Sequence, residues 1–280
     1  MSQAKKPYVI VLGNEKGGTG KSTLSMHLIT YLVRQGYNVG TIDVDAHQGT
    51  LTRYLENRAQ TAEQQKIRLP MPDHHPLLRS QESVREDAER DEEARMTACL
   101  TALTDKDFIV IDTPGSDSFL SRLAHAQADT LVTPLNDSFV DLDVLARLCS
   151  QTGAILRPST YSEMVWEQKK RQAMQGRNGF DWVVVRNRLS SLNARNKEEM
   201  LESLEKLAAR VRFRTAPGFG ERVIFRELFL SGMTLLDLQD AGVPLSLSHV
   251  AARQELINLL KVLNLPTLAD HLDNGHKTAA

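Results

Sequence analysis

Short apolar runs alternate with longer amphipathic segments along most of the chain. The first run, residues 8–13, is continuously apolar and ends in a glycine, which is typical of a strand buried on both faces. We predict further strands at residues 38–43, 108–112, 130–134 and 182–186. Helical spacing of apolar positions lies between these runs, at residues 21–35, 49–66, 81–104, 118–128, 139–152 and 161–175. The alternation predicts an α/β fold with a doubly wound, mainly parallel sheet and helices on both faces.

Two stretches of the chain fall outside this alternation. Residues 67–80 contain three prolines and are predicted to be an irregular link. Ser83 and Glu86 then have the spacing of a capping box at the start of the next helix. Near the end of the chain we expect an amphipathic helix at residues 247–263, followed by a polar tail at residues 266–280 that frays.

Length and composition fit an ordinary globular protein. The chain has 280 residues, 41% of them hydrophobic and 25% charged, without an internal repeat or a low-complexity linker. We therefore expect a single domain over residues 1–280. No run of about 18 apolar residues is present to span a membrane, and the N-terminus lacks the apolar segment of a secretory signal. Cys99 and Cys149 are too few for a disulfide framework, which favours the reducing cytoplasm.

The most informative segment lies between the first predicted strand and the first predicted helix. It reads Gly13-Asn14-Glu15-Lys16-Gly17-Gly18-Thr19-Gly20-Lys21-Ser22-Thr23. Glycines permit a positive φ and let backbone N–H groups converge on phosphate oxygens, to which a helix N-terminus adds partial positive charge. Lys21 is predicted to neutralise the phosphates of ATP or ADP, and Ser22 to bind Mg²⁺. The predicted nucleotide-binding residues of this loop are Gly17, Gly18, Thr19, Gly20, Lys21, Ser22 and Thr23.

Two positions distinguish this loop from the usual phosphate-binding loop. Glu15 stands where the first glycine of the usual pattern belongs, and Lys16 precedes the glycine pair although one chain does not need it to hold phosphate. The loop resembles that of the deviant Walker A ATPases, the ParA/MinD family of P-loop NTPases, in which a residue other than glycine is common at the first position. The resemblance implies that Lys16 is catalytic in trans: it reaches across a nucleotide-sandwich homodimer to the phosphate bound by the other subunit.

The same resemblance implies roles for residues at the ends of three strands. At residues 43–45, Asp43 lies near the metal and Asp45 is catalytic, because it orients the attacking water. Four apolar residues lead into Asp112, which resembles a Walker B aspartate that holds the Mg²⁺ shell ahead of a γ-phosphate sensor at residues 113–115. Asn187 reads the edge of adenine. The implied activity is slow Mg-ATP hydrolysis, after which the ATP-bound dimer dissociates.

Four stretches are similar to those family members that place the bacterial division plane: residues 13–18, 133–141, 181–188 and 222–229. This similarity implies that the monomer binds a ParB-type centromere-binding protein near the cell pole. It also implies that the ATP-bound dimer binds double-stranded DNA without sequence preference and inhibits polymerisation of the tubulin-like protein FtsZ. The expected location is the bacterial cytoplasm, at the nucleoid and the pole.

The distribution of charge agrees with a DNA partner. The net charge is −1, yet residues 157–226 contain 15 Lys or Arg against 8 Asp or Glu. We predict that Arg195, Lys197, Arg210 and Arg214 contact DNA phosphates in the dimer. The alternative is a solvated helix face whose basic side chains pair with glutamates one turn away. The tail lacks the basic amphipathic helix with which MinD-type relatives bind membranes, so we expect no membrane anchor.

Other kinds of protein remain open. A ParA-type ATPase that partitions chromosomes, plasmids or cargo shares the same chemistry. A metabolic ligase on this fold would need a substrate pocket, and Cys99 and Cys149 are not placed to hold a shared iron–sulfur cluster of a redox carrier. An inactive nucleotide-binding scaffold is hard to reconcile with Lys21, Asp45 and Asp112.

Overall fold

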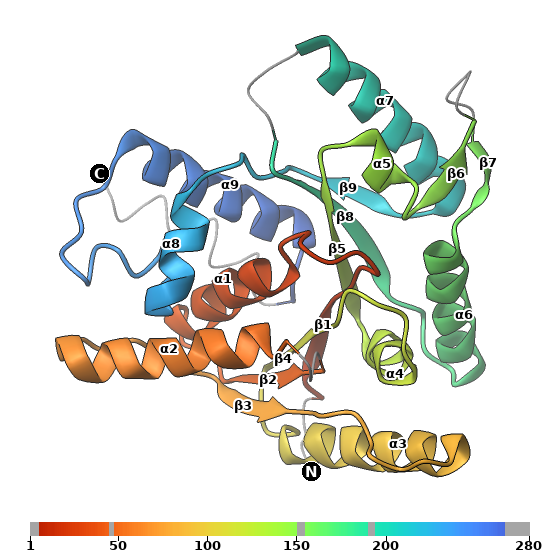
Figure 1. Cartoon of the computed structure of the whole chain (residues 1–280), viewed down its shortest axis with the longest axis horizontal. Helices are drawn as coiled ribbons and strands as arrows, with labels where there is room; N and C mark the ends of the chain where they lie inside the picture. The colour runs from red at the N-terminus through yellow and green to blue at the C-terminus, as the bar shows by residue number, and fades with distance from the viewer. Residues whose placement is uncertain (1–5, 45–47, 150–154, 190–193, 267–280) are drawn as a thin grey trace.

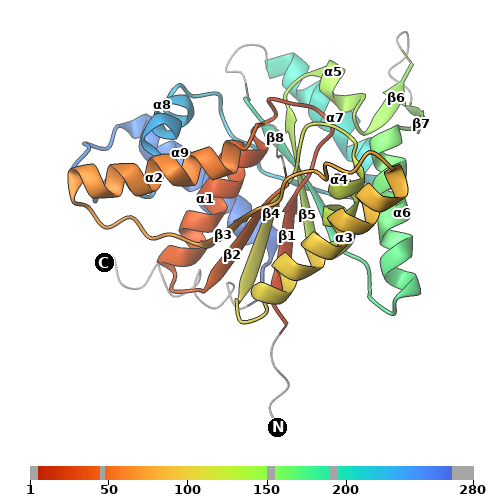
Figure 2. The same ribbon diagram turned by 60° about the horizontal axis from the view of Figure 1, so that its bottom comes forward.

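A seven-stranded sheet forms the centre of the protein. The structure, a computed structural model, describes residues 6–44, 48–149, 155–189 and 194–266, with the backbone alone at residues 139 and 194–199. All neighbouring strands of the sheet are parallel, and β1, β4 and β5 lie side by side at its middle (Figures 1 and 2). In spatial order the strands are β3 (Asp73–Pro76), β2 (Val39–Asp43), β4 (Phe108–Asp112), β1 (Tyr8–Leu12), β5 (Thr130–Asn136), β8 (Asp181–Asn187) and β9 (Arg214–Ala216). The predicted fold class is confirmed.

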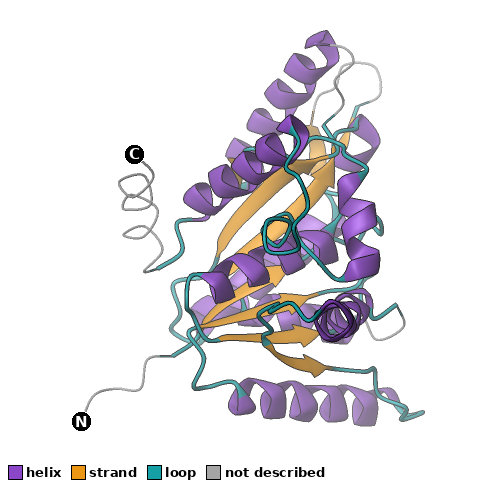
Figure 3. Cartoon of the chain, turned by 90° about the vertical axis from the view of Figure 1, so that its left-hand side faces the viewer, coloured by secondary structure: helices purple, strands orange, loops and turns teal. Residues whose placement is uncertain are grey.

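Helices cover both faces of the sheet, which lies between them in the side view of Figure 3. One face is covered by α1 (Lys21–Arg34), α2 (Thr50–Gln65) and α9 (Leu247–Leu263), and α8 (Ile224–Ser231) packs beside α2. The other face is covered by α3 (Arg85–Ala102), α4 (Phe119–Gln127), α6 (Thr160–Met174) and α7 (Ala194–Val211). In the part of the chain that is described, no helix is both long and apolar enough to cross a membrane.

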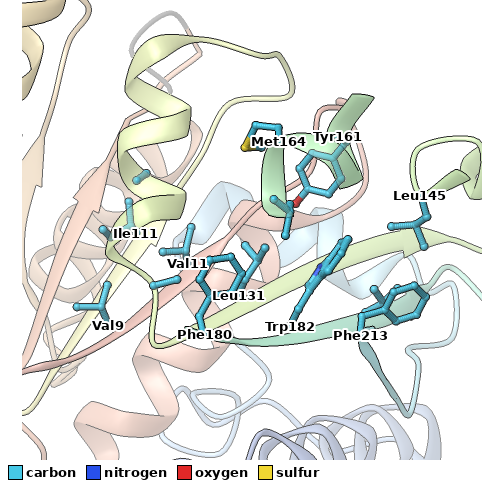
Figure 4. Packing of buried hydrophobic residues seen from close by; sticks show 14 of the residues in the cluster. Val9, Val11, Ile111, Leu131, Leu145, Tyr161, Met164, Phe180, Trp182 and Phe213 are labelled. Atoms are coloured by element: carbon cyan, nitrogen blue, oxygen red, sulfur yellow. The ribbon is translucent and has the colours of Figure 1, made fainter. Parts of the chain in front are cut away.

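Burial on both faces explains the continuous apolar run at the start of the chain. Along β1, Val9 and Val11 point into one hydrophobic core, whereas Ile10 and Leu12 point into the other. Figure 4 shows the first of these cores, where Val9 and Val11 lie near Leu131 of β5. Because every side chain of such a strand meets a core, apolar residues do not alternate with polar ones.

The predicted helix at residues 139–152 is wrong. The structure has a short helix α5 (Phe139–Leu142), followed by an antiparallel hairpin of β6 (Ala146–Leu148) and β7 (Ile155–Pro158). The carbonyl oxygen of Leu145 accepts hydrogen bonds from the backbone N–H of Ser159 and from the Ser162 hydroxyl, at 3.2 and 2.6 Å. That carbonyl oxygen therefore accepts hydrogen bonds from a segment further along the chain, and not from an N–H in the next turn of a helix.

The link at residues 67–80 also differs from its prediction, because it contains the edge strand β3, which pairs with β2. Pro76 ends this strand, where a missing N–H is tolerated. The predicted capping box is wrong as well. The first turn of α3 begins when the N–H of Ala88 bonds to the carbonyl oxygen of Val84, one residue after Ser83, and no side chain caps the helix.

A fully buried ion pair joins α2 to the segment that follows α8. The guanidinium of Arg58 donates two hydrogen bonds to the carboxylate of Asp237, at 2.7 and 2.9 Å, and both side chains are 0% exposed. Arg34 and the backbone N–H of Thr234 donate to the same carboxylate at 2.7 Å each. Burial alone would raise the pKa of Asp237, but the hydrogen bonds and charge of Arg58 hold it well below its usual value. The pair therefore fixes the segment after α8 against α2.

Replacing Asp237 by Ala is expected to lower the free energy of unfolding by about 3–5 kcal/mol, because Arg58 would remain buried and unpaired. Urea denaturation followed by circular dichroism measures this loss. The matched control is Asp240→Ala, since Asp240 also pairs with Arg34 but is 49% exposed. Its loss should stay below about 1 kcal/mol, and equal losses for the two variants would contradict the role given to the buried pair.

Candidate nucleotide-binding site

The glycine-rich loop connects the carboxyl end of β1 to the N-terminus of α1, where sequence predicts it. Gly18 and Gly20 have φ values of 72° and 92°, which side chains with a Cβ rarely adopt. At Gly20 a Cβ would also lie 2.4 Å from Nδ2 of Asn187. The glycines thus allow the loop to approach the first turn of α1, whose unpaired N–H groups favour an anion.

A cavity opens over this loop. Every loop residue predicted to bind nucleotide lines it: Gly17, Gly18, Thr19, Gly20, Lys21, Ser22 and Thr23. Residues 114–116 form another part of the wall, together with Arg79 and Arg188, to which the sequence patterns assigned no role. Lys21 is buried, and its Nζ donates a hydrogen bond to the carbonyl oxygen of Lys16 at 3.0 Å. Lys21, Arg79 and Arg188 thus give the cavity a positive charge that favours an anion such as phosphate.

Lys16 points away from this cavity. Its ammonium group forms an ion pair with Asp141 of α5, whose side chain is only 2% exposed. Lys16 lines a separate cavity between α5, the β6–β7 hairpin and the start of α6. Its backbone N–H donates to Oδ1 of Asn14 at 2.8 Å, which anchors the start of the loop. The side chain is thus held by a carboxylate far along the chain that the sequence patterns did not identify.

Two carboxylates lie side by side at the carboxyl edge of the sheet. The parallel register places Asp43 of β2 directly opposite Asp112 of β4. The carboxylate of Asp112 accepts hydrogen bonds from the hydroxyls of Ser22 (2.6 Å) and Ser25 (2.8 Å), and Asp43 accepts two from Thr52. Burial, and secondly the charge of Asp43, raise the pKa of Asp112 to about 7.

This donor set fits Mg²⁺, which prefers hydroxyl and carboxylate oxygens. Ser22 and Asp112 are the side chains best placed to hold it, with Asp43 beside them. In the described residues no group of three or more His, Cys, Asp or Glu side chains suits a metal. A cation here would therefore take the rest of its ligands from water and from phosphate oxygens, as Mg²⁺ commonly does.

The segment after Asp112 packs tightly on the phosphate-binding loop. A Cβ at Gly115 would lie 2.7 Å from the backbone nitrogen of Gly17 and 3.1 Å from the carbonyl carbon of Lys16. The hydroxyl of Thr113 donates to the carbonyl oxygen of Leu12 at 2.8 Å. The segment therefore contacts the phosphate-binding loop directly, which a γ-phosphate sensor at residues 113–115 would require.

A second cavity adjoins the first and shares Gly20, Thr23 and Arg188 with it. Apolar side chains from α1, β8, the connection between β9 and α8, and α8 itself line part of it: Leu24, Val185, Phe219 and Phe225. Asn187 and the charged residues Glu221, Arg222 and Arg226 line the rest. The side-chain N–H₂ of Asn187 donates to the carbonyl oxygen of Thr19 at 2.8 Å. The apolar and aromatic side chains offer flat contacts of the kind that a planar base needs, and Asn187 lines the same cavity, so its role at the adenine edge stays a prediction. The aromatic residues of this wall were not predicted.

Some predicted residues cannot be placed in this site. Asp45 lies outside the described residues, as do the side chains of Arg195 and Lys197. Arg210 donates to the carbonyl oxygen of Ile155 at 2.7 Å, and Arg214 forms an ion pair with Asp181. Arg195 and Lys197 lie near the start of α7, and Arg210 lies near its end, about 20 Å away along the helix axis. The four residues predicted to contact DNA therefore do not form one compact cluster.

Comparison with known proteins agrees with this architecture. The sequence model of the family described as ATPase MipZ matches residues 8–267. The chain belongs to the MipZ ATPase family. The resemblance to the ParA/MinD ATPases is thereby confirmed, and the chain is related to ATPases.

The individual relatives of this MipZ-family chain match it at low sequence identity or over part of its length. It is 32% identical over 149 residues to the chromosome-partitioning ATPase Soj of Thermus thermophilus, an alignment that covers 50% of this chain and 59% of Soj. The chain thus spans about three fifths of the length of that relative. Apo McdA of Cyanothece superposes with a TM-score of 0.60 at 17% identity, covering 92% of this chain and 99% of McdA. The cell division ATPase MinD of Pyrococcus furiosus gives 0.56 at 17% identity, covering 91% and 99%. These two likenesses show the fold.

The pKa of Asp112 has a consequence for stability in the absence of divalent cations. Because its pKa is raised from 3.8 to about 7 on folding, the folded chain binds the extra proton between these values. The carboxyl group therefore makes the free energy of unfolding fall as the pH rises towards 7, and its contribution levels off above that.

Urea denaturation in EDTA should show this fall for the wild-type chain, on the order of 2 kcal/mol between about pH 5 and 7 relative to Asp112→Asn. The Asn variant removes the titrating group and preserves the size of the side chain. The assignment would be wrong if the two proteins had the same pH dependence over this range.

Proposed function

We propose that this chain is a nucleotide-dependent switch that positions the bacterial division site. In this proposal Mg-ATP closes a homodimer, the dimer inhibits FtsZ polymerisation, and slow ATP hydrolysis returns the monomer. The observation that carries the proposal is the placement of Lys16, which begins the phosphate-binding loop but points out of its own phosphate cavity. Membership of the MipZ ATPase family supports the same cycle.

Within one subunit, we assign nucleotide binding to the loop and to the edge of the sheet. The ammonium group of Lys21 would give up its hydrogen bond to the carbonyl oxygen of Lys16 and bind the β- and γ-phosphates. Asn187 would contact the base. Ser22 and Asp112 would hold Mg²⁺, which when bound neutralises charge on the phosphoryl oxygens. Asp45 is proposed to orient the attacking water.

Between subunits, Lys16 is proposed to move from Asp141 to the phosphate bound by the partner. The carboxylate of Asp141 is 2% exposed and loses its cation when Lys16 moves, although Lys16 itself is 40% exposed. Another anion of high charge, such as a triphosphate in a facing subunit, would compensate Lys16 for this loss. ADP lacks the terminal phosphate, so it holds Lys16 more weakly and the dimer separates.

We further propose that the dimer binds double-stranded DNA without sequence preference and that a ParB-type protein recruits the monomer near the pole. The excess of basic residues at positions 157–226 supports the DNA partner. Of the predicted contacts, Arg210 and Arg214 are exposed, although Arg214 already pairs with Asp181. Dimerisation joins two weak basic surfaces, which makes DNA affinity depend on ATP.

A second candidate function is partition of chromosomes, plasmids or cargo. It is favoured by the name of the relative from Thermus thermophilus, a chromosome-partitioning ATPase. The two functions share nucleotide chemistry and DNA binding, and they differ in whether the dimer acts on FtsZ.

The Asp45→Ala variant distinguishes these functions. Without the residue that orients water, the variant should bind ATP, hydrolyse it at least about tenfold more slowly and remain dimeric. Pelleting of FtsZ polymers measures its effect. The ATP-loaded variant is expected to reduce the pelleted mass, whereas ADP-loaded wild-type protein should not.

The control for this experiment is Asp45→Ala combined with Lys21→Ala, which should not bind ATP and should leave the polymers unchanged. If the ATP-loaded single variant binds DNA but leaves the pelleted mass unchanged, the division-site role is wrong and partition is favoured.

A further inference from the structure

We propose that Arg79 is a catalytic residue that binds the terminal phosphate of ATP from within the same chain. The inference rests on the proposed function, because it assumes that ATP is hydrolysed in this cavity. Arg79 lies in the connection between β3 and α3, outside the phosphate-binding loop and outside the strand ends that carry Asp43 and Asp112. Figure 2 shows these two elements, β3 and α3, beside the central strands.

Arg79 lines the phosphate cavity at the end formed by residues 114–116. Its Nη2 lies 3.5 Å from the hydroxyl oxygen of Ser116, the residue that follows the γ-phosphate sensor. Gly20, Thr23 and Arg188 line both this cavity and the adjoining base cavity, whereas Arg79 lines the phosphate cavity without lining the base cavity. A triphosphate whose base lies in the adjoining cavity therefore enters past the shared residues, and its phosphates extend into the cavity that Arg79 lines.

The charge of Arg79 is not matched by the carboxylates around it. Arg79 also lines a shallow cavity with Glu89, Glu92 and Asp117. Two of these acids already form ion pairs, Glu89 with Arg85 and Asp117 with Arg122, and Glu92 accepts a hydrogen bond from the backbone N–H of Ser80 at 3.1 Å.

Among the described residues, Arg79 itself makes no ion pair within 4.0 Å. An exposed guanidinium at the rim of a phosphate cavity, close to acids that have other partners, is available to an incoming anion.

The proposed role differs from that of Lys16. A guanidinium can bind two phosphoryl oxygens at once, which both positions the group and stabilises the charge that develops on it. Arg79 would do this in cis in each subunit, whereas Lys16 acts in trans. Because Arg79 adjoins Ser116, it would also link the terminal phosphate to the segment that senses it.

The test compares Arg79→Ala and Arg79→Lys with Arg85→Ala. Arg85 is a control of the same residue type on the same side of the sheet, but it is 90% exposed, pairs with Glu89 and does not line the phosphate cavity. Affinities for fluorescent ATP and ADP analogues are measured with Mg²⁺, together with steady-state ATP turnover and thermal unfolding.

For Arg79→Ala we expect about a tenfold loss of ATP affinity, a change of less than about twofold for ADP, and a fall in kcat of about ten- to a hundredfold. Arg79→Lys should be intermediate, and Arg85→Ala should match the wild type. Unchanged affinities and turnover, or equal losses for ATP and ADP, would overturn the assignment. The proposed function fails separately, if the wild-type chain does not hydrolyse ATP at all.

Discussion

The parallel register of three central strands is the constraint on which the site depends. It places the ends of β1, β2 and β4 at one edge, so that Asp43 and Asp112 face each other beside the loop that leaves β1. Burial, and secondly the repulsion from the neighbouring carboxylate of Asp43, raises the pKa of Asp112. The fold thus holds a pair of groups that a hard cation would stabilise, next to a helix N-terminus that favours phosphate.

The second determinant is the ion pair between Lys16 and Asp141. It connects the phosphate-binding loop to the segment after β5, and it leaves Lys16 outside the cavity that its own loop forms. The proposed dimer replaces this internal partner with a phosphate of the facing subunit. Lys16 can pair either with Asp141 or with a phosphate of the facing subunit, and these two pairings would be the two states of a switch. A highly charged ligand is needed to compete with a buried carboxylate.

Sequence was sufficient for the sheet core and for the loop, since both have strong local patterns. The continuous apolar runs predicted β1 and β4, helical spacing predicted α1, and the glycine-rich sequence predicted the phosphate-binding loop. The predictions that failed depended on contacts between segments far apart in the sequence. The carbonyl oxygen of Leu145, beyond the end of α5, bonds to Ser159 and Ser162 where a continuing helix was predicted, and β3 forms by pairing with the edge of β2. Asp141 lies in a stretch that resembles the division-plane family members, but the sequence patterns assigned it no partner, and its contact with Lys16 needs the folded chain. Arg79 lines the phosphate cavity from a segment without a recognisable motif.

We propose that Lys16 closes the dimer in response to ATP. Sedimentation velocity of Asp45→Ala, alone and combined with Lys16→Ala, in ATP and in ADP measures this directly. We expect a dimer for Asp45→Ala in ATP only, and a monomer for the double variant even though it binds ATP. A dimer of the double variant in ATP, or of the single variant in ADP, would contradict it.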